Sequence, residues 1–146
     1  MPNKILTNSE EIADQLHSVA IHLLRKLRKE DGGSGLNAPR LSALSVIVFG
    51  GPITLGDLAA AEQVRPPTMT RIVNALEEQG LVLRTQNTKD GRSVYLSATP
   101  AGKKLLMAGR ARRVRALAKP IAALNREEQS VLQEATAILK EVVRII

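Results

Sequence analysis

Residues 54–80 read TLGDLAAAEQVRPPTMTRIVNALEEQG, and this stretch decides how the middle of the chain folds. Its first four residues resemble a helix-capping box with Asp in the usual Glu position, which predicts a short helix over about 55–62. Pro66 and Pro67 fit only the first turn of a helix, where backbone N–H groups lack partners, so a second helix begins there. Gly80 ends that helix as a left-handed cap. Two short helices joined by a tight connector indicate a helix-turn-helix.

After Gly80 the apolar pattern changes from helical to alternating. The alternation predicts strands over residues 81–86 and 93–98. The polar loop between them, NTKDGR at 87–92, contains an Asp-Gly turn signal. We therefore expect a small β-hairpin directly after the helix-turn-helix.

The chain before this stretch predicts two helices. Apolar side chains recur every three or four positions over residues 9–30, and Ser9 is the expected cap. The segment DGGSG at 31–35 predicts a flexible linker. A second helix is expected over 37–49, with Asn37 as its cap.

Two more helices are predicted after the hairpin. One begins at Thr99-Pro100 and ends near Pro120, and the last follows an Asn125 cap with Glu128 three residues on. The first and last helices of the chain carry apolar stripes, which usually mark an interface, although both stripes could instead pack within one chain. We expect a mainly α-helical chain with a small β-hairpin wing, an α+β fold in which a winged helix-turn-helix core is joined to a helical dimerisation region.

The positive charge is concentrated in one segment. Lys and Arg number 21 against 14 Asp and Glu, which gives a net charge of +7 and a pI near 10.3. Residues 103–119 hold seven basic side chains and no acidic one, equal to the whole excess, whereas residues 38–102 carry a net charge of only +1. The charge favours nucleic acid or an anionic surface as partner, the alternative being a solvated helix face. Only Phe49 and Tyr95 are aromatic, which disfavours base stacking with RNA or single strands.

Several classes of protein are excluded by what the sequence lacks. The absence of Cys excludes a disulfide framework, a cysteine–zinc site and thiol chemistry. The N-terminal segment has no apolar core of the kind a secretory signal needs. The most apolar stretch, residues 41–51, is shorter than the ~18 residues of a membrane span. We therefore expect a soluble, cytoplasmic protein that does not contact a membrane.

The sequence offers no catalytic or metal-binding constellation. His17 and His22 are five positions apart, roughly 140° around a helix, and no cluster of carboxylates accompanies them, so both are expected at a surface or an interface. There is no nucleophile–base pair, and GGSG at 32–35 lacks the Lys and the strand context of a phosphate-binding loop. We expect no enzyme activity, no metal and no cofactor.

The second helix of the helix-turn-helix carries a small polar and cationic surface. Pro67, Arg71 and Asn74 lie opposite its apolar face, flanked by Thr68 and Thr70. Major-groove recognition uses such side chains, because Arg can bind guanine, Asn can bind adenine, and Thr can reach a phosphate or a thymine methyl group. The alternative is an ordinary amphipathic surface helix.

The hairpin loop is a second candidate contact with nucleic acid. Lys89 and Arg92 can project into a minor groove, where narrow A/T-rich stretches attract Arg. The alternative is a solvated turn, which the position of the loop directly after the helix-turn-helix disfavours.

Five segments together resemble the MarR family of winged-helix transcriptional regulators: Thr54–Ala59, Pro67–Val82, Arg84, Asp90–Arg92 and Leu96–Gly102. The similarity is continuous over about residues 38–104, and its most specific part is the Asp-Gly-Arg triplet followed by Thr-Pro-Ala-Gly. The resemblance implies a homodimer that places its two recognition helices in successive major grooves and its wings in adjacent minor grooves.

The resemblance also implies roles for individual residues. Arg92 would be the wing arginine, Asp90 the acid that orients it, and Arg84 a support for the wing or a backbone contact. Lys103 and Lys104 follow the wing directly in sequence and are expected near the duplex, where they would add sequence-independent affinity. A small-molecule effector is implied as well, and the scarcity of aromatic residues argues against a phenolic one.

We therefore expect a homodimeric, ligand-responsive repressor that binds a pseudo-palindromic operator in double-stranded DNA. The expected domains are an N-terminal dimerisation helix and linker at 1–36, a winged helix-turn-helix at 37–103, and C-terminal dimerisation helices at 104–146. The alternative is a winged helix that serves protein–protein assembly without an operator, which the basic side chains of Arg71 and Arg92 disfavour.

Overall fold

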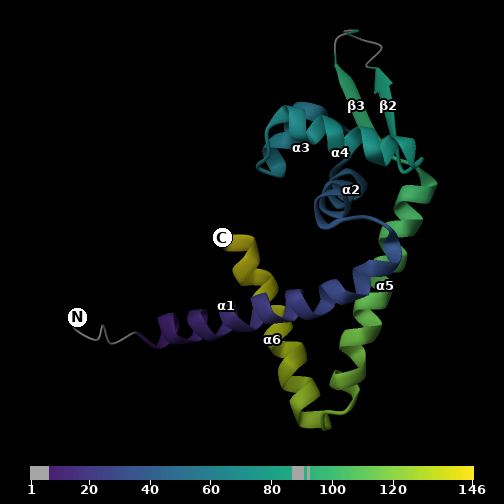
Figure 1. Ribbon diagram of the computed structural model, residues 1–146. Helices are drawn as coiled ribbons and strands as arrows, with labels where there is room; N and C mark the ends of the chain where they lie inside the picture. Colours follow the sequence, from purple (N-terminus) through teal and green to yellow (C-terminus); the bar gives the residue numbers. More distant parts are fainter. Residues whose placement is uncertain (1–6, 87–90, 92) are drawn as a thin grey trace. The chain divides into compact units, whose positions relative to one another are not determined.

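The computed structural model describes residues 7–86, 91 and 93–146. These residues form six α-helices, one 3-10 helix and a three-stranded antiparallel sheet (Figure 1). In chain order the elements are α1 (Asn8–Leu27), the 3-10 helix η1 (Arg28–Ser34), α2 (Ala38–Gly50), β1 (Ile53–Thr54), α3 (Leu55–Ala61), α4 (Pro66–Glu78), β2 (Val82–Gln86), β3 (Val94–Ala98), α5 (Pro100–Ala122) and α6 (Arg126–Ile145). The mainly helical α+β fold with a winged helix-turn-helix is confirmed.

The described chain divides into two compact units. We call Asp31–Ala111 the central unit, and we call the described residues up to Glu30 together with Arg112–Ile146 the helical unit. The central unit contains the helix-turn-helix and the sheet, and the helical unit contains α1, the end of α5 and α6.

The hydrophobic core of the central unit lies between α2, α3, α4 and the sheet (Figure 1). Removing large apolar side chains from water supplies most of the favourable free energy of such a fold. The largest fully buried side chains are Leu44, Ile47, Leu58, Met69, Val73, Leu76, Val82 and Leu96. Every helix and strand around the core contributes one of them or more except β1, which pairs at the edge of the sheet.

The helix-turn-helix follows the predicted boundaries closely. The side chain of Thr54 caps α3 by accepting a 3.1 Å hydrogen bond from the backbone N–H of Asp57. Gln63 turns the chain at φ +55°, a left-handed conformation that usually favours glycine. Gly80 ends α4 at φ +71°, as its lack of a side chain predicts.

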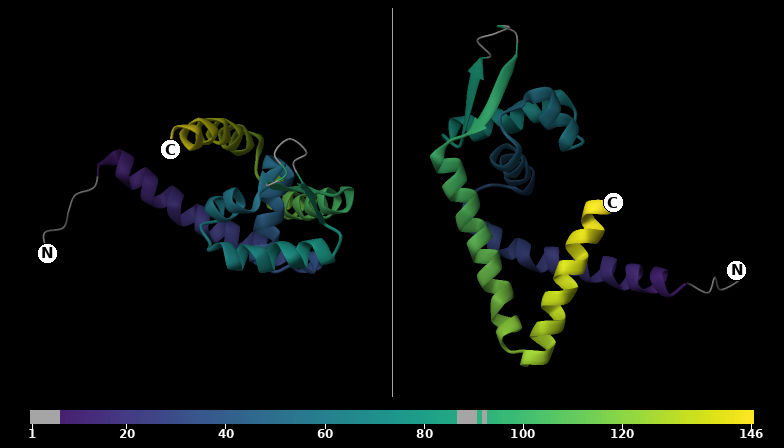
Figure 2. Two further views of the ribbon diagram at one scale, coloured as in Figure 1. Left: turned by 90° about the horizontal axis from the view of Figure 1, so that it is seen from above. Right: turned by 180° about the vertical axis from the view of Figure 1, so that it is seen from behind.

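The sheet has the strand order β1-β3-β2, with all pairs antiparallel. β2 and β3 run side by side away from α4, as Figure 1 and the right view of Figure 2 show. The pairing of Ile53 with Leu96 and of Thr54 with Tyr95 adds β1 to the hairpin. Sequence analysis missed β1 because two residues are too few to show an alternating pattern.

The start of α1 differs from the prediction. Thr7, not Ser9, is the cap, and it forms a complete capping box with Glu10. The backbone N–H of Thr7 donates to the Glu10 carboxylate at 2.8 Å, and the Thr7 hydroxyl accepts from the Glu10 N–H at 3.3 Å. The expectation of Ser9 was wrong because only Thr7 has an acidic residue three positions later that can bond back.

The predicted flexible linker is also wrong. Residues 31–34 belong to η1, and the turn after it is held by its own hydrogen bonds. The Ser34 hydroxyl donates to the carbonyl of Asp31 at 2.8 Å and accepts from the N–H of Leu36 at 3.1 Å. Leu36 then enters the core, and this burial anchors a segment whose composition alone indicates flexibility.

One residue joins α4, the sheet and α5. The hydroxyl of Thr99 donates to the carbonyl of Gly80 at 2.6 Å and accepts from the N–H of Gly102 at 3.0 Å. Gly102 lies against the backbone of Leu81, where a Cβ atom would collide with the carbonyl oxygen. The predicted start of α5 at the Thr99 cap is confirmed, and the helix continues two residues past Pro120 to Ala122.

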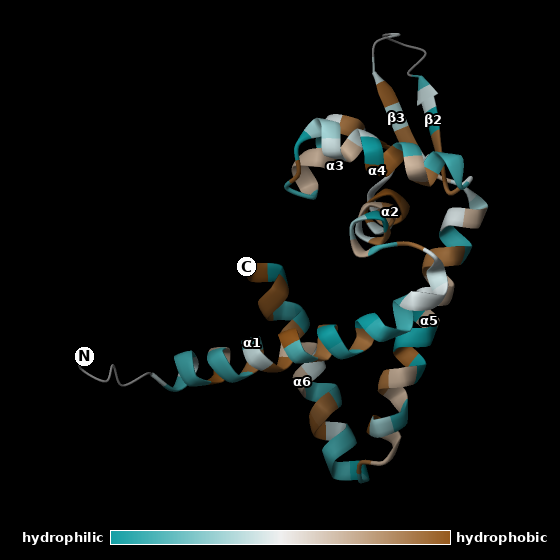
Figure 3. Cartoon of the chain, in the orientation of Figure 1, coloured by the Kyte–Doolittle hydropathy of each residue, from teal (hydrophilic) through white to brown (hydrophobic). Residues whose placement is uncertain are grey.

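The helical unit lacks a core of this kind. Helices α1 and α6 are described in full, and neither contains a buried side chain. The two helices cross in projection in Figure 1 but lie apart when seen from above in Figure 2. The predicted apolar stripes are exposed in the single chain, where Ile138 is 65% and Val143 is 70% exposed. Figure 3 shows hydrophobic segments, coloured brown, along α6.

Candidate nucleic-acid interface

Helix α4 has one fully buried face and one exposed face, as its periodicity predicts. Met69, Val73 and Leu76 are 0% exposed and seat the helix in the core. The opposite side faces solvent, because these positions lie half a turn away from the buried ones. The exposed residues of α4 are Pro66, Pro67, Thr68, Arg71, Asn74, Glu77 and Glu78. The polar and cationic surface that sequence analysis predicted is therefore continuous and accessible.

The N-terminal end of α4 offers side chains rather than backbone N–H groups to a polar partner. Pro66 and Pro67 have no N–H. The N–H groups of Thr68 and Met69 both donate to the carbonyl of Arg65, at 3.0 and 3.1 Å. A phosphate at this helix end would therefore have to be bound by side chains.

The position of Thr70 changes what this residue can bind. It is half-buried, and its hydroxyl donates to the carbonyl of Pro66 at 2.9 Å. Because the hydroxyl proton is already engaged, Thr70 has no donor left for a phosphate oxygen, which only accepts. Its methyl group and its oxygen lone pairs remain for a base, so Thr70 suits direct contact with thymine better than contact with phosphate.

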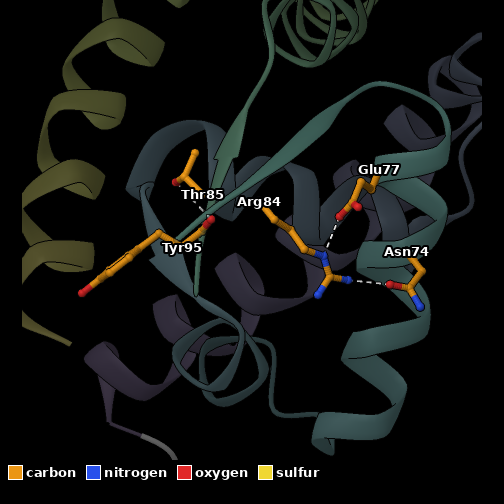
Figure 4. A network of polar contacts seen from close by, with 5 residues as sticks. All are labelled: Asn74, Glu77, Arg84, Thr85 and Tyr95. Atoms are coloured by element: carbon orange, nitrogen blue, oxygen red, sulfur yellow. Dashed lines mark hydrogen bonds and ion pairs between the residues drawn. The ribbon is translucent and has the colours of Figure 1, made fainter. Parts of the chain in front are cut away.

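Arg84 on β2 is connected to two side chains of α4 (Figure 4). Its Nε donates to a carboxylate oxygen of Glu77 at 2.5 Å, and its Nη2 donates to Oδ1 of Asn74 at 2.5 Å. Sequence analysis did not predict this network. The spacing of Asn74 and Glu77, three residues apart on one helix face, is the signal that could have indicated a shared partner.

The three predicted wing residues, Lys89, Asp90 and Arg92, lie outside the described residues. The structure describes the strands on either side of them and Gly91, whose carbonyl accepts a 2.8 Å hydrogen bond from the side-chain amide of Gln86. Gly91 has φ +66°, the left-handed conformation expected at an Asp-Gly turn.

The basic side chains of α5 are not one uniform row. Lys103 and Lys104 are exposed near the start of the helix. Arg112, in the helical unit, is half-buried, and its Nε donates to the carbonyl of Glu30 at 3.0 Å. The seven basic residues of the predicted segment therefore include at least one with a structural role within the protein.

The two histidines of the chain lie at the surface, as predicted. His17 and His22 are exposed on α1, and Nδ1 of His22 lies 2.8 Å from the carbonyl of Ser18. Among residues 7–86, 91 and 93–146, no three His, Asp or Glu side chains gather as a metal site would require. Within the same residues, no helix combines the length and apolar character needed to cross a bilayer.

Comparison with known proteins places this geometry in a family. A family model described as MarR family matches residues 36–94. An uncharacterised helix-turn-helix-type transcriptional regulator of Mycobacterium bovis is 36% identical over 135 residues, which cover 92% of this chain and 94% of the relative.

Solved structures share the fold over almost the whole chain. The transcriptional regulator Tm0710 of Thermotoga maritima matches with a TM-score of 0.82 and 25% identity, covering 92% of this chain and 95% of the other. A mutant of MepR from Staphylococcus aureus, bound to an oligodeoxyribonucleotide, matches with a TM-score of 0.69 and 19% identity, covering 94% of this chain and 99% of the other. The second likeness concerns the fold alone.

Proposed function

The chain belongs to the MarR family of helix-turn-helix transcriptional regulators, and from this premise we propose that it binds a pseudo-palindromic operator in double-stranded DNA as a homodimer. The family and the relatives are transcriptional regulators rather than enzymes. The single observation that carries the proposal is the exposed face of α4, which presents Arg71 and Asn74 on a helix whose other face is completely buried. That face fits a major groove, and half-sites about one helical turn apart fit a symmetric dimer. The oligodeoxyribonucleotide bound to the MepR mutant supports DNA as the partner of this fold.

In this proposal the contacts divide by task. Five residues of α4 face base edges and the nearby backbone of the major groove: Pro67, Thr68, Thr70, Arg71 and Asn74. Arg92, oriented by Asp90, enters the adjacent minor groove, with Lys89 on the same loop. The cations Lys103 and Lys104 at the start of α5 bind phosphates, which gives affinity without sequence information. Arg84 acts through its contacts with α4.

The dimer in this proposal is formed by the helical unit. An isolated helical unit leaves wide apolar faces of α1 and α6 in water, although burying such surfaces is favourable by about 25 cal/mol per Å². A symmetric interface between two copies would cover the same faces on both chains. The exposed apolar side chains include Ile12, Val19, Leu24, Val131, Ile138, Val143 and Ile145. We propose that residues 1–36 and 104–146, which include this unit, serve dimerisation and that residues 37–103 bind DNA.

A shallow apolar groove belongs to the same dimerisation surface. It has a volume of about 490 Å³ and is lined by Leu124 and five residues of α6. Its lining side chains Val131 and Leu132 are part of the stripe that the partner chain would cover, so we assign the groove to the partner rather than to an effector. The proposal that a small molecule regulates DNA binding then rests on family membership. It is tested by measuring whether added compounds release the protein from its operator.

Repression is the simplest regulatory outcome of this proposal. A dimer that occupies an operator within a promoter excludes RNA polymerase from the same DNA. The protein would act in the cytoplasm, where bacterial chromosomal DNA is located. Repression is tested by comparing transcription of the adjacent gene with and without the regulator.

The test of DNA binding is selection of duplexes by the purified full-length protein, from genomic fragments and from a random library. We expect enrichment of a pseudo-palindrome, and we expect Arg71→Ala to abolish the enrichment. A matched control is Arg126→Ala, which removes an exposed arginine from the first turn of α6. Failure to enrich any duplex would overturn DNA binding and favour a role in protein–protein assembly.

A further inference from the structure

The contact between Arg84 and Asn74 limits what Asn74 can offer to a base. A guanidinium group has only donors, so the amide must turn its oxygen, Oδ1, toward Arg84. The orientation of the amide is thereby fixed by chemistry. The 2.5 Å bond from Nη2 of Arg84 uses one of the two lone pairs of Oδ1 and places a positive charge beside it, and the amide nitrogen points away from the guanidinium (Figure 4).

Glu77 holds the guanidinium in the position that this contact needs. Its carboxylate accepts from Nε of Arg84 at 2.5 Å, so two groups of the same guanidinium bind two side chains of one helix face. Ion pairs between exposed side chains contribute little to folding stability. The main consequence of the Glu77–Arg84–Asn74 network is therefore the fixed direction of the Asn74 amide.

The direction of the amide determines which base it suits. Adenine is recognised when an amide both accepts from N6 and donates to N7, so the N6 donor would have to share Oδ1 with the positively charged Arg84. Guanine presents two acceptors, N7 and O6, along the same edge. The cation beside Oδ1 repels the positively polarised N6–H2 group of adenine, whereas the free NH2 group of the amide can donate to either acceptor of guanine.

We propose that Arg84 biases Asn74 toward donating, so that the protein prefers guanine over adenine at the position that Asn74 contacts. This inference rests on the proposed function, because it assumes that the exposed face of α4 meets the edges of bases. Arg84 is a positioning residue here, since it acts on the base through Asn74.

The experiment compares base preferences of the full-length protein and three variants, measured by selection from a random duplex library. Asn74→Ala identifies the position in question, because the preference there disappears. The wild type is expected to favour guanine over adenine at that position by about tenfold, the discrimination that one contact of this kind supplies. Arg84→Met removes the positive charge and the donor beside Oδ1, and it is expected to shift the preference at this one position toward adenine.

The matched control is Arg65→Met, which makes the same substitution at an exposed arginine that caps the start of α4. If either arginine binds a phosphate, its replacement weakens binding to all duplexes equally and changes no base preference. Circular dichroism and thermal melting confirm that the variants are folded, as expected for substitutions of exposed side chains.

The possible outcomes distinguish this inference from the proposed function. If the wild type prefers adenine at the Asn74 position, or if Arg84→Met leaves that preference unchanged, the inference is overturned while DNA binding stands. The inference is overturned as well if Asn74→Ala alters no position of the selected site. If the wild type selects no duplex at all, the proposed function fails and this inference fails with it.

Discussion

The hydroxyl of Thr99 donates a 2.6 Å hydrogen bond to the carbonyl of Gly80, although 19 residues separate the two. Gly80 follows the last turn of α4, and Thr99 lies between β3 and α5. The bond therefore ties the end of the proposed recognition helix to the point where the wing strand leads into the next helix. Together with the Gly102 N–H that bonds back to Thr99, it sets the position of the hairpin relative to α4.

Replacing Thr99 should lower stability measurably. Thr99→Val keeps the shape of the side chain but removes the hydroxyl, which leaves the Gly80 carbonyl and the Gly102 N–H without this partner. We expect the free energy of unfolding to fall by about 1–2 kcal/mol, as for other lost helix caps. Urea denaturation at a fixed protein concentration measures the change. Thr99→Ser retains the hydroxyl and should stay near the wild type, and equal stability of the Val variant would contradict the proposed link.

A methyl group at Gly102 should also destabilise the fold. Its Cβ would collide with the carbonyl oxygen of Leu81 and press on a methyl group of Leu44. Gly102→Ala is expected to cost about 1–3 kcal/mol, the usual range for overpacking. Gly56→Ala is the matched control, because a Cβ there meets open space within α3. The control should be neutral or stabilising in thermal melting, and parallel behaviour of the two variants would refute the close-contact explanation.

If the helical unit forms the dimer, two substitutions on α6 should differ in their effect on dimerisation. Ile138→Lys places a charge in the apolar stripe. Burying that charge in the interface would cost free energy and so weaken the dimer. Gln133→Lys adds the same charge on the polar side of the helix. In sedimentation velocity at micromolar concentration, the wild type and Gln133→Lys should be dimers, and Ile138→Lys should shift toward monomer. A monomeric wild type would remove the dimer from the proposal.

Neutralising Lys103 and Lys104 should weaken binding to every duplex and reduce its dependence on salt. Each phosphate contact contributes roughly 0.9 to the slope of log K against log salt, so the double Gln variant should lose about two. Titration of operator and unrelated duplexes from low to moderate salt measures both slopes. Lys140→Gln, on α6, is the control for lost charge. An unchanged slope would mean that both lysines face solvent in the complex.

Removing Arg92 should lower operator affinity by roughly tenfold or more, if it occupies a minor groove as proposed. Arg92→Ala leaves α4 intact, so selectivity in the major groove should persist. The measurement is binding to the selected operator and to a version with G/C pairs where the wing lands. The wild type should lose affinity on the G/C version and the Arg92 variant should not, because wide minor grooves attract arginine less. Full affinity of the variant would exclude the wing from binding.

The parts of the fold that could be predicted from sequence are those with local signals. Thr54, the paired prolines at 66–67 and Gly80 each constrain the backbone next to them, so the bounds of α3 and α4 were predicted within a residue or two. The 31–35 linker was mispredicted because Gly-rich composition suggests flexibility, whereas Leu36 is anchored in a core formed by distant residues.

The candidate site also combines features that the sequence predicts with features that it does not. Periodicity along α4 correctly placed Arg71 and Asn74 on the exposed face, since a helix of known start has a known phase. Periodicity could not show that the hydroxyl of Thr70 is engaged with Pro66, because that depends on a side-chain rotamer. It also could not show which residue of the hairpin would reach back to the helix.

The sequence by itself determined the order of the six α-helices and the two hairpin strands, the exposed polar face of α4 and the segment that holds the excess positive charge. Those properties follow from residues that are neighbours along the chain or recur at a helical period. Only the tertiary structure decided that Arg84 engages Asn74 and Glu77, since the contact depends on how β2 packs beside α4. Side chains from different elements meet only when the core has set the distance and register between them, and that packing directs the Asn74 amide nitrogen away from Arg84.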